Sequence, residues 1–225
     1  MTDIEWSPFW LSFKLASITT VSLFLISTPL IYSIYFHSKS IRTVLKAIIS
    51  LPLVLPPTVL GYYLLLLLRP EGWVGQLSQQ WFDTRLVFSF SGLVIGSIIF
   101  SLPFMVNPIL SALENLPDNY REAAYTLGKS RWNTLIYVLL PNVKSSLWVG
   151  GVMTFAHTIG EFGVILMIGG SIPNETRVAS IAIYNEVEML HYANANIYAA
   201  ILLLFSFIVL ILVYLYQNQR PQGVI

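Results

Sequence analysis

The sequence predicts an all-α protein, a polytopic membrane bundle of five to six transmembrane helices, and two observations lead to this fold class. The first is composition, because 56% of the 225 residues are hydrophobic and only 10% are charged, with a mean hydropathy of +0.70. A soluble domain of this length needs many more charged side chains to cover its surface. The second is a set of five apolar runs, each long enough to cross the hydrocarbon core of a bilayer, which takes about 20 helical residues.

These runs place the predicted spans in a single transmembrane domain, residues 1–225. The spans lie near residues 10–36, 45–68, 86–110, 144–169 and 196–217. Segment 178–193 is amphipathic, which favours a surface or re-entrant helix over a short sixth membrane segment. The N-terminal stretch carries Asp3 and Glu5 where a signal peptide would carry lysine or arginine, so we expect the first span to be retained.

Basic residues divide unequally between the two sides of the predicted bundle. One side holds eight and the other four: Lys39, Arg42, Lys46, Arg121, Lys129, Arg131, Lys144 and Arg220 against Lys14, Arg69, Arg85 and Arg177. Because cytoplasmic loops are enriched in lysine and arginine, we expect the loop 114–143 and the C-terminus in the cytoplasm and the N-terminus outside. The net charge of +1 offers no basic face to nucleic acid, so that class of partner is excluded.

Prolines are concentrated in the second and third spans, at Pro52, Pro56, Pro57, Pro103 and Pro108. Each removes a helical hydrogen bond and crowds the preceding turn. In lipid, the freed carbonyl groups need protein or water partners. Two interpretations stay open: kinks tolerated in a packed bundle, or helices that bend around a translocation path.

The loop 114–143 is predicted to form a helix, a glycine turn and a second helix. Asn119 and Glu122 have the spacing of a capping box, which predicts a helix over 120–127. Gly128 suits the left-handed position that closes a helix. Ser130 can cap the second helix, which runs to Pro141 at the membrane entrance.

The triplet Gly128-Lys129-Ser130 does not predict a nucleotide site. A phosphate-binding loop needs a glycine five residues before its second glycine, on a loop between a strand and a helix. That position is Ala123, inside a predicted helix. The chain also lacks a nucleophile–base constellation, cysteine and the HExxH pattern. We therefore expect no enzyme activity, no cofactor and no metal site.

The same loop resembles the EAA loop of ABC importer permeases. That signature is Glu-Ala-Ala, three residues, Gly, nine residues, an aliphatic residue, one residue and Leu-Pro. The matching residues are Glu122, Ala123, Ala124, Gly128, Val138, Leu140 and Pro141, with Val138 in place of the usual isoleucine. The resemblance implies a molybdate/methionine permease-like fold whose coupling helix docks on a separate ATPase subunit. It implies that Glu122 and the two alanines face that ATPase.

The resemblance also implies the partners and the substrate class. Two copies of the chain would form the pore in the bilayer, with two ATPase subunits beneath and a soluble binding protein on the outer face. Residues 157–188, with Gly-Glu-Phe-Gly near their start, and "LPPTVLGYYLL" in the second span resemble the sulfate and molybdate branch. The implied substrate is a tetrahedral oxyanion, molybdate first, with tungstate and sulfate as alternatives. A secondary transporter driven by an ion gradient is the competing class, and no internal repeat supports it.

Polar residues in the spans are candidates for the translocation path or its gate. His157 and Glu161 stand four residues apart, and an acid within a membrane segment is a functional candidate. Because a carboxylate repels a dianion, we expect Glu161 to pair with His157 or Arg177, or to accept backbone N–H groups beside Gly160 and Gly163. Gating and direct substrate contact are the alternatives, and Gly160 and Gly163 are candidates for the path or its gate together with Glu161. Small polar residues could line the path or pack helices together: Thr58, Ser97, Asn107, Thr154 and Thr158.

Overall fold

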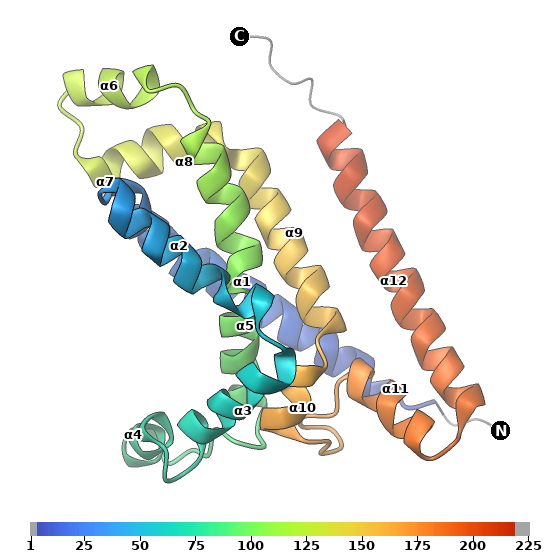
Figure 1. The fold of residues 1–225 in the computed structure, drawn as a ribbon. Helices are drawn as coiled ribbons and strands as arrows, with labels where there is room; N and C mark the ends of the chain where they lie inside the picture. Colours follow the sequence, from blue (N-terminus) through green and yellow to red (C-terminus); the bar gives the residue numbers. More distant parts are fainter. Residues whose placement is uncertain (1–3, 219–225) are drawn as a thin grey trace.

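The computed structural model describes residues 4–218, a range that contains helices and connecting turns and no strand (Figure 1). Three helices are long and apolar enough to cross a membrane: α1 (Ser7–Phe36), α5 (Phe90–Glu114) and α12 (Tyr192–Asn218). Two bent helix pairs bring the number to as many as five if each pair is one span. The predicted all-α fold class is confirmed.

The second predicted span is two helices rather than one. Helix α2 (Lys39–Val54) and helix α3 (Pro57–Leu68) meet at a bend of 108°. Leu55 and Pro56 between them have extended backbone, with ψ of 138° and 134°. A residue before proline is pushed out of the helical region, and proline suits the first position of a helix. The consecutive prolines therefore end one helix and begin the next.

The fourth predicted span, 144–169, is also interrupted. Helix α9 (Lys144–Gly160) ends where Glu161 becomes extended, with ψ of 133°. Helix α10 (Gly163–Gly169) is a separate short helix. The prolines at 103 and 108, in contrast, lie inside the continuous helix α5.

Helices α3 and α10 lie against each other because glycines remove side chains at their contact. A Cβ atom added to Gly61 would lie 2.7 Å from Met167 Cβ, and one added to Gly163 would lie 2.7 Å from Pro57 Cβ. Both distances are shorter than carbon–carbon contacts allow. The two short helices that follow the breaks therefore pack on each other.

Helices α1, α5 and α9 pack together at the centre of the molecule. Two buried apolar clusters lie around these helices. The first joins these helices to the loop 114–143 and includes Leu23, Ile34, Met105, Ile109 and Leu139. The second surrounds α10 and includes Leu15, Leu93, Val164, Ile168 and Ile181.

The remaining helices lie at the edges of the bundle (Figure 1). Helix α4 (Trp73–Phe82) follows α3, and helix α11 (Ala179–Glu188) precedes α12. With ten residues, α11 is shorter than a membrane crossing. Its buried residues are Ala179, Ile181 and Ala182. Helix α12 leaves a row of large apolar side chains exposed, as a lipid-facing helix would: Leu203, Leu204, Phe207, Ile208, Ile211 and Leu215.

All six tryptophans are exposed, and they belong to elements at the two ends of the bundle. Helix α4 and the start of α1 lie at one end, and the loop helices lie at the other (Figure 1). Trp6, Trp10, Trp73 and Trp81 belong to the first end, whereas Trp132 and Trp148 belong to the loop helices and the start of α9. Such aromatic belts mark the two interfaces of a membrane protein.

Candidate functional site

The loop between α5 and α9 forms the predicted helix, turn and helix. Its first helix is α6 (Asn119–Thr126). Gly128 follows with φ of +74°. The N–H of Gly128 donates to the Tyr125 carbonyl at 2.9 Å, and the N–H of Lys129 donates to the Ala124 carbonyl at 3.0 Å. These two bonds define a Schellman motif, which satisfies the last carbonyl groups of a helix. The prediction that Gly128 closes this helix is confirmed.

The second half of the loop is helical and contains a π-helical turn. It consists of α7 (Arg131–Thr134), the π-helix η1 (Leu135–Leu139) and α8 (Leu140–Asn142). Ser130 caps it, because its Oγ accepts from the N–H of Asn133 at 3.3 Å. The prediction for Ser130 is confirmed.

The predicted capping box at Asn119 is wrong. Asn119 is the first helical residue, and Asp118 occupies the N-cap position without a side-chain bond to the helix backbone. The Asp118 carbonyl accepts from the N–H groups of Arg121 and Glu122, both at 3.0 Å, which starts the helix one residue earlier. Asp118 instead forms an ion pair with Arg121 at 2.8 Å. Aspartate is as good an N-cap residue as asparagine, so the sequence spacing alone did not show which of Asp118 and Asn119 is the N-cap residue.

The residues of the EAA signature divide into an exposed set and a buried set. Glu122, Ala123, Gly128 and Pro141 are exposed, Val138 is half-buried, and Ala124 and Leu140 are buried. Ala124 is 3% exposed, so only Ala123 of the two alanines is open to a partner. The small side chain of Ala124 lets α6 lie against η1, with which it is in contact.

The second half of the loop is fixed in the core of the bundle. Leu135 and Leu139 of η1 are fully buried in the first apolar cluster, with Met105, Ile109 and Leu113 of α5. Interiors are close-packed, so a displacement of η1 must also displace the helices around it. The loop therefore consists of α6, which is exposed on the surface of the bundle, and η1, which is packed in its core.

A second group of candidates lies where α9 ends. The Glu161 side chain is 4% exposed, and its Oε2 accepts a hydrogen bond from Ser97 Oγ of α5 at 2.9 Å. The Glu161 carbonyl accepts from Ser180 Oγ of α11 at 2.6 Å. Glu161 thus connects α9, α5 and α11 at the break. Its Oε1 has no hydrogen-bond partner within residues 4–218.

The predicted pairing of Glu161 with His157 or Arg177 is wrong. Helix α9 ends at Gly160, so Glu161 leaves the helical face that His157 occupies. His157 Nδ1 instead lies 2.9 Å from Ser101 Oγ, and Arg177 forms an ion pair with Glu5 at 2.5 Å. Backbone N–H groups do not pair with the carboxylate either, because its one hydrogen bond from the described part of the chain comes from the Ser97 hydroxyl.

The small polar candidates do not form one set. Thr158 Oγ1 donates to the Thr154 carbonyl at 2.9 Å and lies 3.0 Å from Ser101 Oγ. A buried polar cluster therefore lies between α5 and the end of α9, and its members are Ser97, Ser101, Thr154, Thr158 and Glu161. Asn107 lies elsewhere, bonded to Ser50 of α2 at 3.1 Å. Thr58 is exposed near the start of α3.

Sequence reasoning missed Ser101 and Ser180 in this cluster. The signal for Ser101 was present, since it lies one turn after Ser97 on the same face of a helix. Ser180 is brought to Glu161 only by the packing of α11 against the end of α9.

Comparison with known proteins decides what this arrangement belongs to. The model of the binding-protein-dependent transport system inner membrane component family matches residues 17–221. The chain belongs to this family. Its members are membrane subunits of ABC transporters and carry no catalytic site of their own, so the predicted permease fold is confirmed.

Members of the family with curated names are similar over most of the chain. The molybdenum transport system permease protein ModB of Azotobacter vinelandii is 42% identical over 91% of this chain and 90% of its own length. ModB of Escherichia coli K12 is 35% identical over 84% and 82%. The sulfate transport system permease protein CysT of the same organism is 32% identical over 82% and 66%.

Solved structures of family-like transporters share the fold. A bacterial alginate ABC transporter, in complex with a periplasmic protein bound to an alginate pentasaccharide, matches all of this chain and 82% of its own with a TM-score of 0.77 at 17% identity. An amino acid ABC transporter matches 95% and 92% with a TM-score of 0.64 at 18% identity.

Proposed function

We propose that this chain is the membrane permease of an ATP-driven importer that moves a tetrahedral oxyanion into the cytoplasm. Molybdate is the first candidate for this oxyanion. The observation that carries the proposal is the 42% identity to a molybdenum permease over nine-tenths of both chains. Sulfate permeases are similar at 32–33% identity. Sulfate and tungstate, which have the same shape and charge, are therefore the alternatives.

The proposed partners follow from the exposed surface of α6 and from the family. Glu122, Ala123 and the 78% exposed Leu127 leave α6 open to a protein surface. We expect this coupling helix to dock on an ABC ATPase, with two ATPase subunits serving two copies of the chain. We also expect a soluble binding protein to deliver substrate at the opposite face, as a periplasmic protein accompanies the alginate transporter.

Charge supports an orientation with the loop 114–143, called the coupling loop from here on, in the cytoplasm. Seven of the eight basic residues on that predicted side belong to α2, the coupling loop or the first residue of α9, and the eighth, Arg220, lies outside the described residues. In this orientation the start of α1 and α4 face outward, since they lie at the other end of the bundle (Figure 1).

Movement of the coupling helix would then drive the transport cycle. ATP binding would bring the two ATPase subunits together and displace the docked α6 helices. Because η1 is packed in the core, this displacement would tilt α1, α5 and α9 and shift a two-state equilibrium between inward-open and outward-open forms. The polar cluster at the end of α9 would move with them. Its hydroxyl groups could contact an oxyanion weakly, as a path that must release its substrate requires.

Reconstitution of the chain with its ATPase and binding protein in vesicles tests the proposal. We expect radiolabelled molybdate to enter only when ATP is present on the side of the coupling loop. Competition with unlabelled tungstate and sulfate ranks the three anions. Uptake that continues without the ATPase would instead support a transporter driven by an ion gradient.

A further inference from the structure

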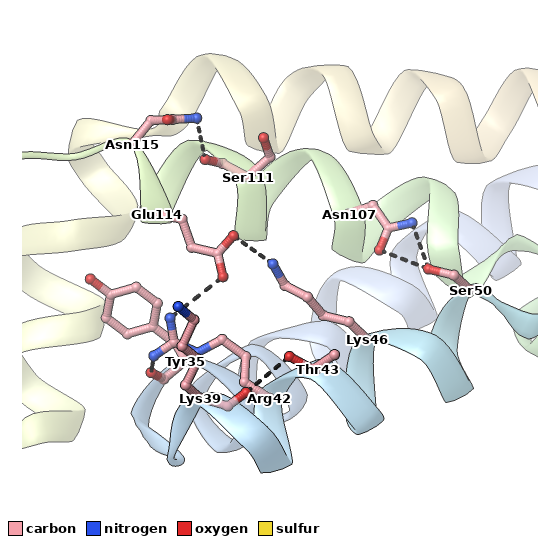
Figure 2. A network of polar contacts seen from close by, with 10 residues as sticks. All are labelled: Tyr35, Lys39, Arg42, Thr43, Lys46, Ser50, Asn107, Ser111, Glu114 and Asn115. Atoms are coloured by element: carbon pink, nitrogen blue, oxygen red, sulfur yellow. Dashed lines mark hydrogen bonds and ion pairs between the residues drawn. The ribbon is translucent and has the colours of Figure 1, made fainter.

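A charged network joins α2 to the end of α5 (Figure 2). Glu114, the last residue of α5, accepts from two cations on α2. Lys46 Nζ lies 2.5 Å from its Oε2, and Arg42 Nη1 lies 3.5 Å from its Oε1. The three side chains are between 27% and 34% exposed, so protein shields them in part from water and salt.

The same arginine extends the network to α1. Arg42 Nη2 donates to the Tyr35 carbonyl at 2.5 Å, and its guanidinium lies 5.3 Å from the centre of the Tyr35 ring. Further along the contact between α2 and α5, Asn107 donates to Ser50 Oγ at 3.1 Å (Figure 2). Polar bonds therefore fix α2 to α5 at two levels.

The position of this network relates it to both moving parts of the proposed cycle. Glu114 is the last residue of α5 and the first of the coupling loop, whereas α2 leads to the break at Leu55–Pro56. Helix α2 packs mainly on α5. Its other face is exposed and apolar: Ile41, Val44, Ile48 and Leu51. Apolar contact has no direction and would let α2 slide, but a carboxylate held by two cations fixes its register.

We propose that Arg42, Lys46 and Glu114 form a clamp that makes α2 move with the coupling loop and so carries its displacement to the break at Leu55–Pro56. The three are positioning residues, since they act through the helix and not on the substrate. The clamp rests on the proposed function, because a docked ATPase must supply the movement. Coupling between distant sites is carried by packed side chains, salt bridges and rigid helices, and the clamp supplies such a connection.

Glu114→Gln in the reconstituted transporter tests the clamp. Glutamine keeps the size of the side chain but removes the charge that holds Arg42 and Lys46. We expect the variant to copurify with the ATPase and to hydrolyse ATP, while molybdate uptake per ATP hydrolysed falls about fivefold. The double variant Lys46→Glu with Glu114→Lys restores an ion pair between the helices and should regain most of the uptake per ATP.

Lys39→Gln is the matched control. Lys39 is an exposed cation on the same helix, and among the described residues it forms no ion pair. Its replacement should leave uptake per ATP unchanged. Unchanged uptake per ATP in Glu114→Gln, or a double variant no better than the single one, would overturn the clamp alone. Loss of ATP-dependent uptake in the wild type would overturn the proposed function and the clamp with it.

A distance measurement tests the clamp even if Glu114→Gln assembles poorly. The sequence has no cysteine, so spin labels can be attached at Val44→Cys on α2 and Lys129→Cys in the coupling loop, both exposed positions. With the clamp intact, the distance between the labels should be the same with and without ATP. A change of several ångströms in the otherwise wild-type transporter would show that α2 does not follow the loop and would overturn the proposal.

Discussion

Glu161 is a buried acid whose carboxylate receives one hydrogen bond among the described residues. Burial of a polar group without a partner is costly, and the cost is larger for a group that can carry charge. Ser97 donates to Oε2, and the backbone of Glu161 is fixed separately by Ser180. The hydrogen bonding of the Glu161 side chain therefore depends on Ser97, whereas the end of helix α9 at Gly160 does not.

Ser97→Ala should destabilise the protein by about 1–3 kcal/mol, because it leaves the buried carboxyl without a donor. Thermal unfolding of the purified transporter in detergent measures the change as a lower midpoint. Ser91→Ala is the control, since Ser91 is an exposed serine in the first turn of the same helix and should have almost no effect. Equal midpoints for the two variants would show that the Ser97–Glu161 bond adds nothing to stability.

Gly128→Val should reduce uptake while ATP hydrolysis continues, because valine disfavours the left-handed backbone by roughly 1–2 kcal/mol. A Cβ atom at Gly128 would meet nothing within 4 Å, so the effect is conformational and not steric. Asparagine tolerates φ of +74° better than valine does. Gly128→Asn should therefore retain more uptake than Gly128→Val, and the reverse order would argue against the turn as the cause.

At the scale of elements, the sequence predicted the helices well and their interruptions poorly. The apolar runs located α1, α5 and α12 to within a few residues. The prolines, which end α2 and begin α3, indicated that the second span could bend, but the position that α3 takes after the bend depends on its packing partner. That partner is α10, a helix distant in sequence. Hydropathy does not report such contacts, so 144–169 also read as one span.

For the candidate site too, the sequence predicted local features correctly and contacts between distant segments incorrectly. The glycine turn at Gly128 was predicted correctly because it is a local backbone requirement, whereas the coupling role that the EAA signature implies stays a prediction. The expected pair of His157 and Glu161 assumed that the helix continues, and it ends between them. Ser101 and Thr158 are brought together by the packing of α5 on α9, which a single sequence does not specify.

Gly163→Ala should separate α10 from α3, because its new Cβ would lie 2.7 Å from the rigid ring of Pro57. Overpacking of this kind costs about 1–3 kcal/mol. We expect a lower unfolding midpoint and reduced uptake. Gly160→Ala is the matched control, since a Cβ there meets nothing within 4 Å. If both variants kept wild-type stability, the close contact between α3 and α10 would not be required.

At the scale of the whole molecule, the positions of the basic residues and of the tryptophans describe how the bundle lies in a membrane. Basic residues are concentrated in α2 and the coupling loop, and the exposed tryptophans lie in elements at both ends. The tryptophans indicate where the membrane begins and ends, and the charges support the proposed orientation with the loop 114–143 in the cytoplasm. The proposed orientation matters for the proposed function, because an ATPase could dock on α6 only from the side where ATP is available.

Single cysteines at Lys39 and Gln80 should label from opposite sides of the membrane. Lys39 is exposed at the start of α2, and Gln80 is exposed on α4. Because the chain has no cysteine of its own, each variant reports one position. In intact cells made permeable only in the outer membrane, an impermeant maleimide should label Gln80→Cys and not Lys39→Cys. Inside-out vesicles should give the opposite pattern.

Labelling after detergent treatment is the control, since both cysteines should then react to a similar extent. Detergent removes the barrier but not the exposure of each side chain, so any remaining difference would come from burial and not from sidedness. Labelling of Lys39→Cys in cells with an intact inner membrane would reverse the orientation. It would place the coupling loop away from cytoplasmic ATP, and the loop could not then be the surface on which an ATPase acts.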